Sequence, residues 1–148
     1  MSFTQAELDY LGSQVLGRLA TVAPDGTPQV SPTGFRYNAE LGTIDIGGHN
    51  MARSKKFRNV AAGSRAAFVV DDIESTKPWK VRGVEVRGDA EALTGATAPA
   101  GLPGTPGEII RIHPRRIVSW GLGESEPYRV NARSVASSRS VKTRNRRR

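Results

Sequence analysis

The residues best suited to bind a ligand follow a short apolar segment that ends near position 46. Two glycines end that segment, and glycines allow a backbone to approach a ligand closely. A predicted helix then begins, and the start of a helix offers unpaired N–H groups and a positive dipole end that favour phosphate. The pattern predicts a phosphate grip for a nucleotide-like cofactor. Its candidate residues are Gly48, Asn50 (the predicted helix cap), Arg53, Ser54, Lys55 and Lys56.

Helical spacing divides the basic residues of this stretch into two groups. A helix over residues 51–62 would have an apolar face made of Phe57, Val60 and Ala61. Arg53 falls on that face and Lys56 at its margin, whereas Lys55 and Arg58 point away. An ordinary basic helix in solvent accounts for Lys55 and Arg58. It leaves Arg53 and Lys56 beside the core without an acid in the helix, and we therefore favour a bound anion as their partner.

Another basic residue lies on a predicted strand. Alternation over residues 80–93 places Arg82 on the same face as two valines. A cation on an apolar face needs an acid, an anion or an open rim where it reaches water, and periodicity alone leaves these three alternatives open. Trp79 and Trp120 could cover a flat ring, although tryptophans at strand positions more often belong to a core or an interface.

The sequence contains no set of residues with a recognisable catalytic spacing. It has no cysteine, no serine–histidine–acid motif and no paired carboxylates. The two histidines, His49 and His113, are too few for a histidine metal site. We therefore predict no catalytic side chain and no metal, so that any chemistry would come from a bound cofactor.

The net charge of +8 resides in the C-terminal segment. Residues 1–128 contain 14 basic and 14 acidic residues, whereas residues 129–148 contain 8 basic residues and no acid. We interpret residues 129–148 as a basic, disordered tail, because they are rich in serine and arginine and lack an apolar pattern. Non-specific contact of this tail with nucleic acid is the alternative. The balanced charge of the remaining chain predicts no specific nucleic-acid partner.

Residues 1–128 are predicted to form one mainly β domain. Its helices are expected over residues 4–14 and 51–62, and its strands over 15–22, 29–37, 43–47, 65–71, 80–93 and 108–122, with loops at 72–79 and 96–107. A six-stranded antiparallel barrel is the natural closure, because it leaves no exposed strand edge. No apolar run approaches the ~20 residues of a membrane span, and the N-terminus lacks a signal pattern. We expect no membrane contact and a cytoplasmic location.

Several short motifs occur in an order that resembles a known family. Residues 17–22, 25–32, 56–60 and 65–71 together resemble the pyridoxamine-phosphate-oxidase-like split β-barrel family. Further motifs at 34–38, 44–48, 78–79, 82–88 and 117–122 are similar to its coenzyme F420 branch. Within that branch they are most similar to the OxyR-like subgroup of dehydrotetracycline reductases from oxytetracycline biosynthesis. The resemblance covers about residues 3–122 and leaves the tail outside it.

The resemblance implies a split β-barrel that forms a homodimer with two cofactor sites at the subunit interface. It implies that the basic stretch at residues 53–56 holds the cofactor phosphate. Family members often carry an arginine two positions before the lysine that Lys56 matches, and here Ser54 takes that position. The residues expected along the ring system are Gln29, Val30, Ser31, Pro32 and Thr33, with Arg36 and Trp120 as further lining residues and Arg82 as an additional candidate.

The implied reaction is hydride transfer from reduced coenzyme F420 to an activated C=C bond of a small organic substrate. For the OxyR-like subgroup this substrate is a dehydrotetracycline-type polyketide intermediate of antibiotic biosynthesis. FMN shares the phosphorylated ribityl chain of coenzyme F420, so an FMN-binding oxidoreductase of the same fold is an alternative. A nucleic-acid-associated protein that acts through its basic tail is the alternative from another class.

Overall fold

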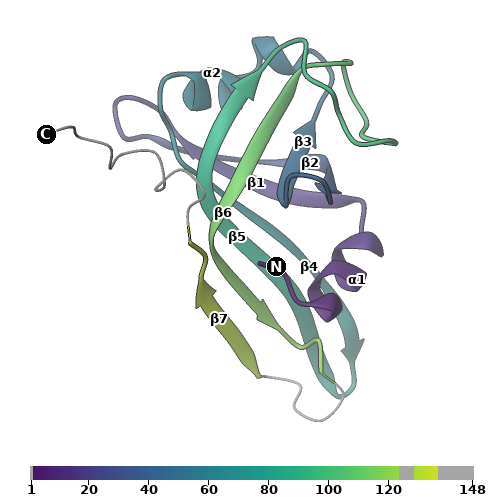
Figure 1. Cartoon of the computed structure of the whole chain (residues 1–148). Coiled ribbons are helices and arrows are strands. Elements are labelled where there is room, and N and C mark those ends of the chain that lie inside the picture. The colour runs from purple at the N-terminus through teal and green to yellow at the C-terminus, as the bar shows by residue number, and fades with distance from the viewer. Residues whose placement is uncertain (1, 124–128, 137–148) are drawn as a thin grey trace, which may run out of the picture.

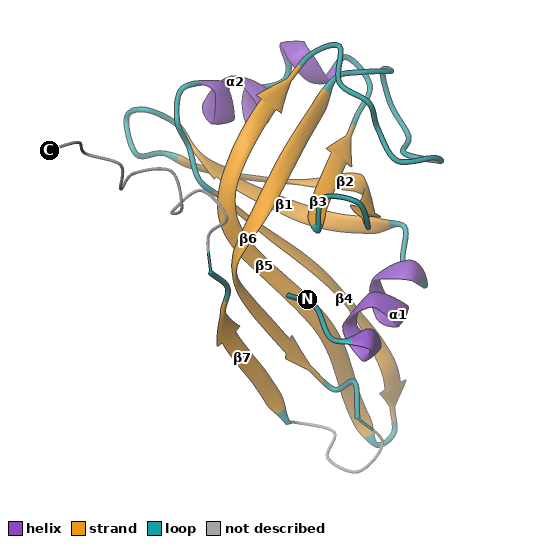
Figure 2. Ribbon diagram, in the orientation of Figure 1, coloured by secondary structure: helices purple, strands orange, loops and turns teal. Residues whose placement is uncertain are grey.

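The computed structural model describes residues 2–123 and 129–136 and consists mainly of strands (Figures 1 and 2). Its elements are α1 (Gln5–Gly12), β1 (Leu16–Val22), β2 (Pro28–Asn38), β3 (Thr43–Gly47), the 3-10 turn η1 (Met51–Arg53), α2 (Lys55–Ala61), β4 (Ala66–Thr76), β5 (Trp79–Leu93), β6 (Ile109–Trp120) and β7 (Val130–Ser134). In Figure 1, α2 lies at one end of the molecule and the tip of the β4–β5 hairpin at the other.

The strands form one antiparallel sheet that closes on itself. Their order is β3-β2-β1-β4-β5-β6-β7, and an additional pairing of β3 with β6 completes the ring. Buried side chains from the strands and both helices fill its interior, with Phe35 and Phe68 edge to face at 5.1 Å near its centre. This arrangement confirms the predicted antiparallel split barrel with two short helices. It has seven strands among the described residues, where six were predicted.

The additional strand, β7, lies in the segment predicted to be a disordered tail. It pairs with β6 from Trp120 opposite Val130 to Arg116 opposite Ser134. Arg133 also reaches α1, where its guanidinium binds the buried carboxylate of Glu7. The barrel therefore continues beyond the predicted boundary at residue 128. Residues after this boundary pair with the free edge of β6 and neutralise the buried acid Glu7. Residues 137–148 of the predicted tail lie outside the described residues.

The segment 72–79, predicted to be a polar loop, belongs to a long hairpin. β4 continues to Thr76, and β5 begins at Trp79. Asp72 lies opposite Arg82 in the strand register, so the charges that suggested a loop neutralise each other across the two strands. The β4–β5 hairpin is consequently longer than polarity alone predicted.

The predicted helix over residues 51–62 is divided into two parts. η1 ends at Arg53, and Ser54 then caps α2 by accepting a hydrogen bond from the N–H of Phe57 (3.2 Å). Asn50 adopts a left-handed conformation (φ 50°) and makes no side-chain cap, so the cap of α2 is Ser54 and not, as predicted, Asn50. The predicted end is right, because Gly63 follows α2 with a positive φ of 103° that suits glycine.

No helix of the described residues is both long and apolar enough to cross a membrane.

The capping box predicted for α1 is present, with Thr4 and Glu7 exchanging hydrogen bonds between side chain and backbone (2.9 and 3.2 Å). α1 lies beside the lower half of the barrel in Figure 2, on the side of the β4–β5 hairpin.

Candidate functional site

The predicted phosphate grip lies at the connection between β3 and α2. The loop between β5 and β6 packs against it so closely that a side chain at Gly47 would meet the Pro103 carbonyl oxygen at 2.0 Å. This loop also occupies two backbone donors of the connection. The N–H of Asn50 donates to Thr105 Oγ1, and the N–H of Ala52 donates to Glu108 Oε2, both at 2.9 Å. Two N–H groups of the kind that the sequence offered to a phosphate are therefore satisfied within the chain.

The cations of the grip remain available. Arg53 and Lys55 are exposed and Lys56 is half-buried, and none of the three takes part in an ion pair among the described residues. Ala61 is exposed, so the predicted apolar face of the helix is reduced to Phe57 and Val60, joined by the buried Asn59. Arg53 precedes the start of α2, so one helical wheel cannot place it on the face of Phe57.

The predicted ring-binding strand, β2, presents two different faces. Gln29, Ser31 and Thr33 face inward, and Val30 and Pro32 face outward, with Val30 67% exposed. The inner face lies on the side of α2, since Asn59 donates to Thr21 Oγ1 (3.1 Å) and Thr21 donates to Gln29 Oε1 (3.3 Å). β2 pairs with β3 only from Gly34 onward, so Pro32 lies where one strand edge is unpaired and its missing N–H is tolerated.

Two hydroxyl groups on the inner face of β2 have no partner in the structure. Ser31 Oγ and Thr33 Oγ1 are buried without a hydrogen bond among the described residues. The residue Thr33 as a whole is only 5% exposed, so solvent hardly reaches it. Unpaired buried polar atoms are uncommon and call for an explanation such as water or a ligand. These hydroxyls belong to two residues that the sequence assigned to the cofactor site.

Arg82 has an internal acid as its partner. Its guanidinium donates two hydrogen bonds to Asp72 (2.8 and 2.9 Å) and lies 5.3 Å from the centre of the Tyr10 ring. The hydrogen bonds with Asp72 raise the pKa of Arg82, and those from Arg82 lower the pKa of Asp72. Burial raises the pKa of Tyr10, whose hydroxyl donates to Asp72 at 2.9 Å. The sequence left an acid, an anion or an open rim as alternatives for Arg82, and the structure provides the acid, Asp72.

Arg36 and Trp120 occupy separate places. Arg36 donates to the carbonyl of Phe35 (2.8 Å) and lies beside Gly101 of the β5–β6 loop. Trp120, at the end of β6, packs against Gly83, where a side chain would come within 2.4 Å of its ring. Trp120 lines a hollow of about 210 Å³, and Arg82 lines a neighbouring one of about 530 Å³. Both hollows lie in the half of the barrel beside α1, away from the grip.

The profile of the family described as pyridoxamine 5'-phosphate oxidase matches residues 3–120, which is most of the chain. The chain belongs to this family. It is 48% identical over 138 residues to the 5a,11a-dehydrotetracycline/5a,11a-dehydrooxytetracycline reductase of Streptomyces rimosus, which covers 93% of this chain and 96% of that protein. The predicted family and its subgroup of dehydrotetracycline reductases are thereby confirmed.

Solved structures of other proteins share the fold of this pyridoxamine 5'-phosphate oxidase family member. A heme binding protein from Mycobacterium smegmatis superposes with a TM-score of 0.63 at 16% identity, over 90% of this chain and 59% of that chain. An F420 reductase superposes with a TM-score of 0.57 at 24% identity, over 78% of this chain and 98% of that chain. At these identities the superpositions establish the fold alone.

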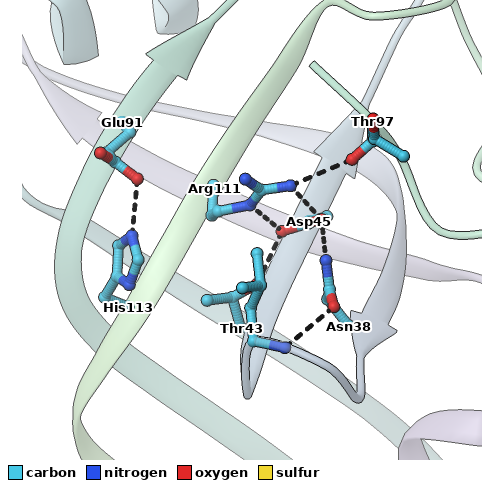
Figure 3. A network of polar contacts seen from close by, with 8 residues as sticks. Asn38, Thr43, Asp45, Glu91, Thr97, Arg111 and His113 are labelled. Carbon is cyan, nitrogen blue, oxygen red and sulfur yellow. Dashed lines mark hydrogen bonds and ion pairs between the residues drawn. The ribbon is translucent and has the colours of Figure 1, made fainter. Parts of the chain in front are cut away.

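Sequence reasoning missed a buried polar network of this family member, shown in Figure 3. Asp45 is fully buried in β3 and accepts two hydrogen bonds from Arg111 (3.0 and 3.1 Å), one from Asn38 (3.0 Å) and one from Thr43 (2.8 Å). Arg111 also donates to the carbonyl of Thr97 (3.2 Å), and its hydrogen bonds with Asp45 raise its pKa. An acid in the middle of an apolar strand was the available signal. The network fixes the β5–β6 loop to β3 and β6.

Proposed function

We propose that this protein is a coenzyme F420-dependent reductase that transfers a hydride to an activated C=C bond, with a dehydrotetracycline-type polyketide as substrate. The observation that carries this proposal is the 48% identity, over nearly the whole of both chains, to a protein named as a dehydrotetracycline reductase. An oxidoreductase needs no side-chain nucleophile if its cofactor carries the electrons, which agrees with the absence of a recognisable catalytic motif from the sequence.

The residues present fit a phosphorylated deazaflavin. Arg53, Lys55 and Lys56 provide three cations without an ion pair among the described residues. The hydroxyls of Ser31 and Thr33 provide buried hydrogen-bonding groups without partners in the same described ranges. When bound in its reduced form, the deazaflavin would supply the hydride for the reaction.

The protein's own residues would bind and orient this cofactor. Side-chain cations suit the phosphate, since charge-assisted hydrogen bonds are about twice as strong as neutral ones. Backbone donors contribute less than the sequence predicted, because Asn50 and Ala52 donate to Thr105 and Glu108. The side chains of the grip therefore carry most of the proposed phosphate binding, and β2 gives the ring system a rigid neighbour.

We infer that the active form is a homodimer with the cofactor at its interface. Exposed apolar side chains support this proposal: on one outer face of the sheet, which also carries the Arg18–Asp71 ion pair, Leu16 and Val22 of β1, Val30 of β2 and Ile73 of β4 are each 47–67% exposed. Burial of such side chains against a second copy is favourable. A second subunit would also account for the separation of Arg82 and Trp120 from the grip, since each site would take residues from both chains.

Replacement of Val22 tests the homodimer without touching the proposed cofactor residues. In Val22→Asp a charge would be buried in the interface, so we expect the sedimentation coefficient of a monomer at concentrations where the wild type sediments as a dimer. Thr27→Asp, in the exposed turn after β1, is the matched control and should sediment like the wild type. A wild-type protein that sediments as a monomer contradicts the proposal.

Titration with coenzyme F420 and with FMN tests the cofactor. We expect the fluorescence of the deazaflavin to respond, followed by oxidation of its reduced form when a dehydrotetracycline is added. Enones, quinones and bilins serve as comparison substrates in the same assay of deazaflavin oxidation. Tight FMN binding without any response to the deazaflavin would replace this proposal by the FMN-dependent alternative.

A further inference from the structure

The loop between β5 and β6 holds the turn that carries the phosphate grip. Thr105 binds both sides of this turn: its Oγ1 accepts from the N–H of Asn50 (2.9 Å), and its own N–H donates to the carbonyl of Gly48 (3.0 Å). At the end of the loop, Glu108 Oε2 accepts from the N–H of Ala52 (2.9 Å). The loop therefore holds the turn on both sides of Asn50, whose backbone is left-handed.

Glu108 places a negative charge at this turn. The residue that it binds, Ala52, directly precedes Arg53, the first cation of the grip. Glu108 makes no ion pair with Arg53 or with another base in the described ranges 2–123 and 129–136. A single hydrogen bond from a backbone N–H does not cancel the charge of a carboxylate. A phosphate at the grip would therefore experience repulsion from Glu108.

We propose that Glu108 is a positioning residue that fixes the phosphate-binding turn and, through its charge, keeps the affinity for the phosphorylated cofactor moderate. This inference rests on the proposed function, which assigns the phosphate to residues 53–56. The hydrogen bond to Ala52 favours binding because it preorganises the turn, whereas the charge opposes binding. A reductase that consumes a reduced cofactor has to release the oxidised form after each cycle, and a repelling carboxylate favours that exchange.

The two effects of Glu108 can be separated by substitution. Glu108→Gln keeps an acceptor oxygen at the same distance along the side chain and removes the charge, whereas Glu108→Ala removes both. Glu40→Gln is the matched control, because it removes one negative charge from an exposed turn at the other end of β3. Two ligands distinguish charge from shape: coenzyme F420, and its deazaflavin core without the phosphate. Fluorescence titration gives the dissociation constants.

We expect Glu108→Gln to bind coenzyme F420 about two- to fivefold more tightly than the wild type at low salt. The gain should disappear at high ionic strength and should be absent for the phosphate-free core. Glu108→Ala should bind coenzyme F420 more weakly than Glu108→Gln and should leave the affinity for the phosphate-free core unchanged, and the amide of Ala52 should exchange with solvent faster in this variant than in Glu108→Gln. The exchange rate of the Ala52 amide reports the stability of the turn in the protein without any cofactor.

Equal affinities of Glu108→Gln and the wild type for coenzyme F420 at low salt would overturn the inference while leaving the proposed function intact. The same holds if Glu108→Gln gains equally for the phosphate-free core, or if Glu40→Gln produces the same gain. A wild-type protein that binds neither coenzyme F420 nor its core contradicts both the proposed function and this inference.

Discussion

At the scale of single residues, the half-buried Lys56 and the exposed Arg58 provide the sharpest test of the proposed site. We expect Lys56→Ala to weaken cofactor binding by about 1.5–3 kcal/mol, the cost of a lost charge-assisted hydrogen bond. Arg58→Ala removes a neighbouring charge in the last turn of α2 and should have a smaller effect. Fluorescence titration of both variants makes the comparison, and equal losses would show that the phosphate does not distinguish the two positions.

Asp45 is a second residue with a distinct expected phenotype. Asp45→Ala leaves the guanidinium of Arg111, whose side chain is only 13% exposed, without its acid. Breaking a buried pair from one side costs about 3–5 kcal/mol. The matched control is Asp71→Ala, which breaks the half-exposed pair with Arg18 and should cost at most about 1 kcal/mol. Urea unfolding measures both values, and similar losses would contradict a special role for the Asp45 network.

Partners that are distant in sequence explain what residue-level reasoning could not predict. Arg82 required an acid, an anion or an open rim, and the sequence could not indicate Asp72, since that residue was assigned to a loop. Asp45 meets Arg111 only because β3 closes the barrel against β6. Alternation did place Ser31 and Thr33 on one face of β2, but their missing hydrogen bonds are visible only in the packed barrel.

At the scale of elements, the signals that predicted correctly were local ones. The capping box of α1, the turn between β1 and β2, and the glycine after α2 depend on neighbouring residues, and the structure contains all three. β7 was missed because its structure depends on the free edge of β6 and on Glu7, more than a hundred residues away. Composition correctly identified a basic segment there but could not indicate these partners.

The contact between β7 and α1 should make stability depend on pH. Burial raises the pKa of Glu7, but hydrogen bonds from Arg133, Ser119 and the Thr4 backbone outweigh it and leave the pKa below its ordinary value of 4.5. A folded-state pKa below the unfolded one means that the carboxylate stabilises the fold fully above about pH 4.5. This contribution is lost as the pH falls through the folded-state pKa.

Substitution of Arg133 isolates this contribution. In Arg133→Met we expect the loss of stability on acidification below about pH 4.5 to shrink, since burial raises the pKa of Glu7 and the largest opposing hydrogen bond is removed. Arg129→Met removes an exposed arginine from the same segment and should keep the wild-type pH dependence. Urea midpoints at a series of pH values compare the three proteins. A wild-type profile in Arg133→Met would indicate that Glu7 does not depend on this partner.

At the scale of the whole molecule, the candidate residues separate into two groups. The grip follows β3 at the start of α2, at one end of the molecule in Figure 1, whereas Arg82 and Trp120 line hollows beside α1. The order of motifs in the sequence predicted the family and the antiparallel barrel, but it could not show this separation. Under the proposed homodimer, the distance between the groups follows from a site shared by two chains, and the exposed apolar face supplies the contact.

Two truncations test whether the basic C-terminal segment belongs to the reductase. Ending the chain after Ala136 removes six basic residues (Arg139, Lys142, Arg144, Arg146, Arg147 and Arg148) and keeps β7. Ending it after Tyr128 also removes Arg133 and leaves the buried Glu7 without its ion-pair partner. We expect the longer variant to keep reductase activity and unfolding midpoint, whereas the shorter one loses several kcal/mol of stability.

A nucleic-acid-associated protein would instead lose its salt-dependent binding of RNA or DNA in both variants. If the variant ending at Ala136 loses the reduction of dehydrotetracycline, the basic segment participates in catalysis, and the division between a barrel with β7 and a dispensable extension is wrong.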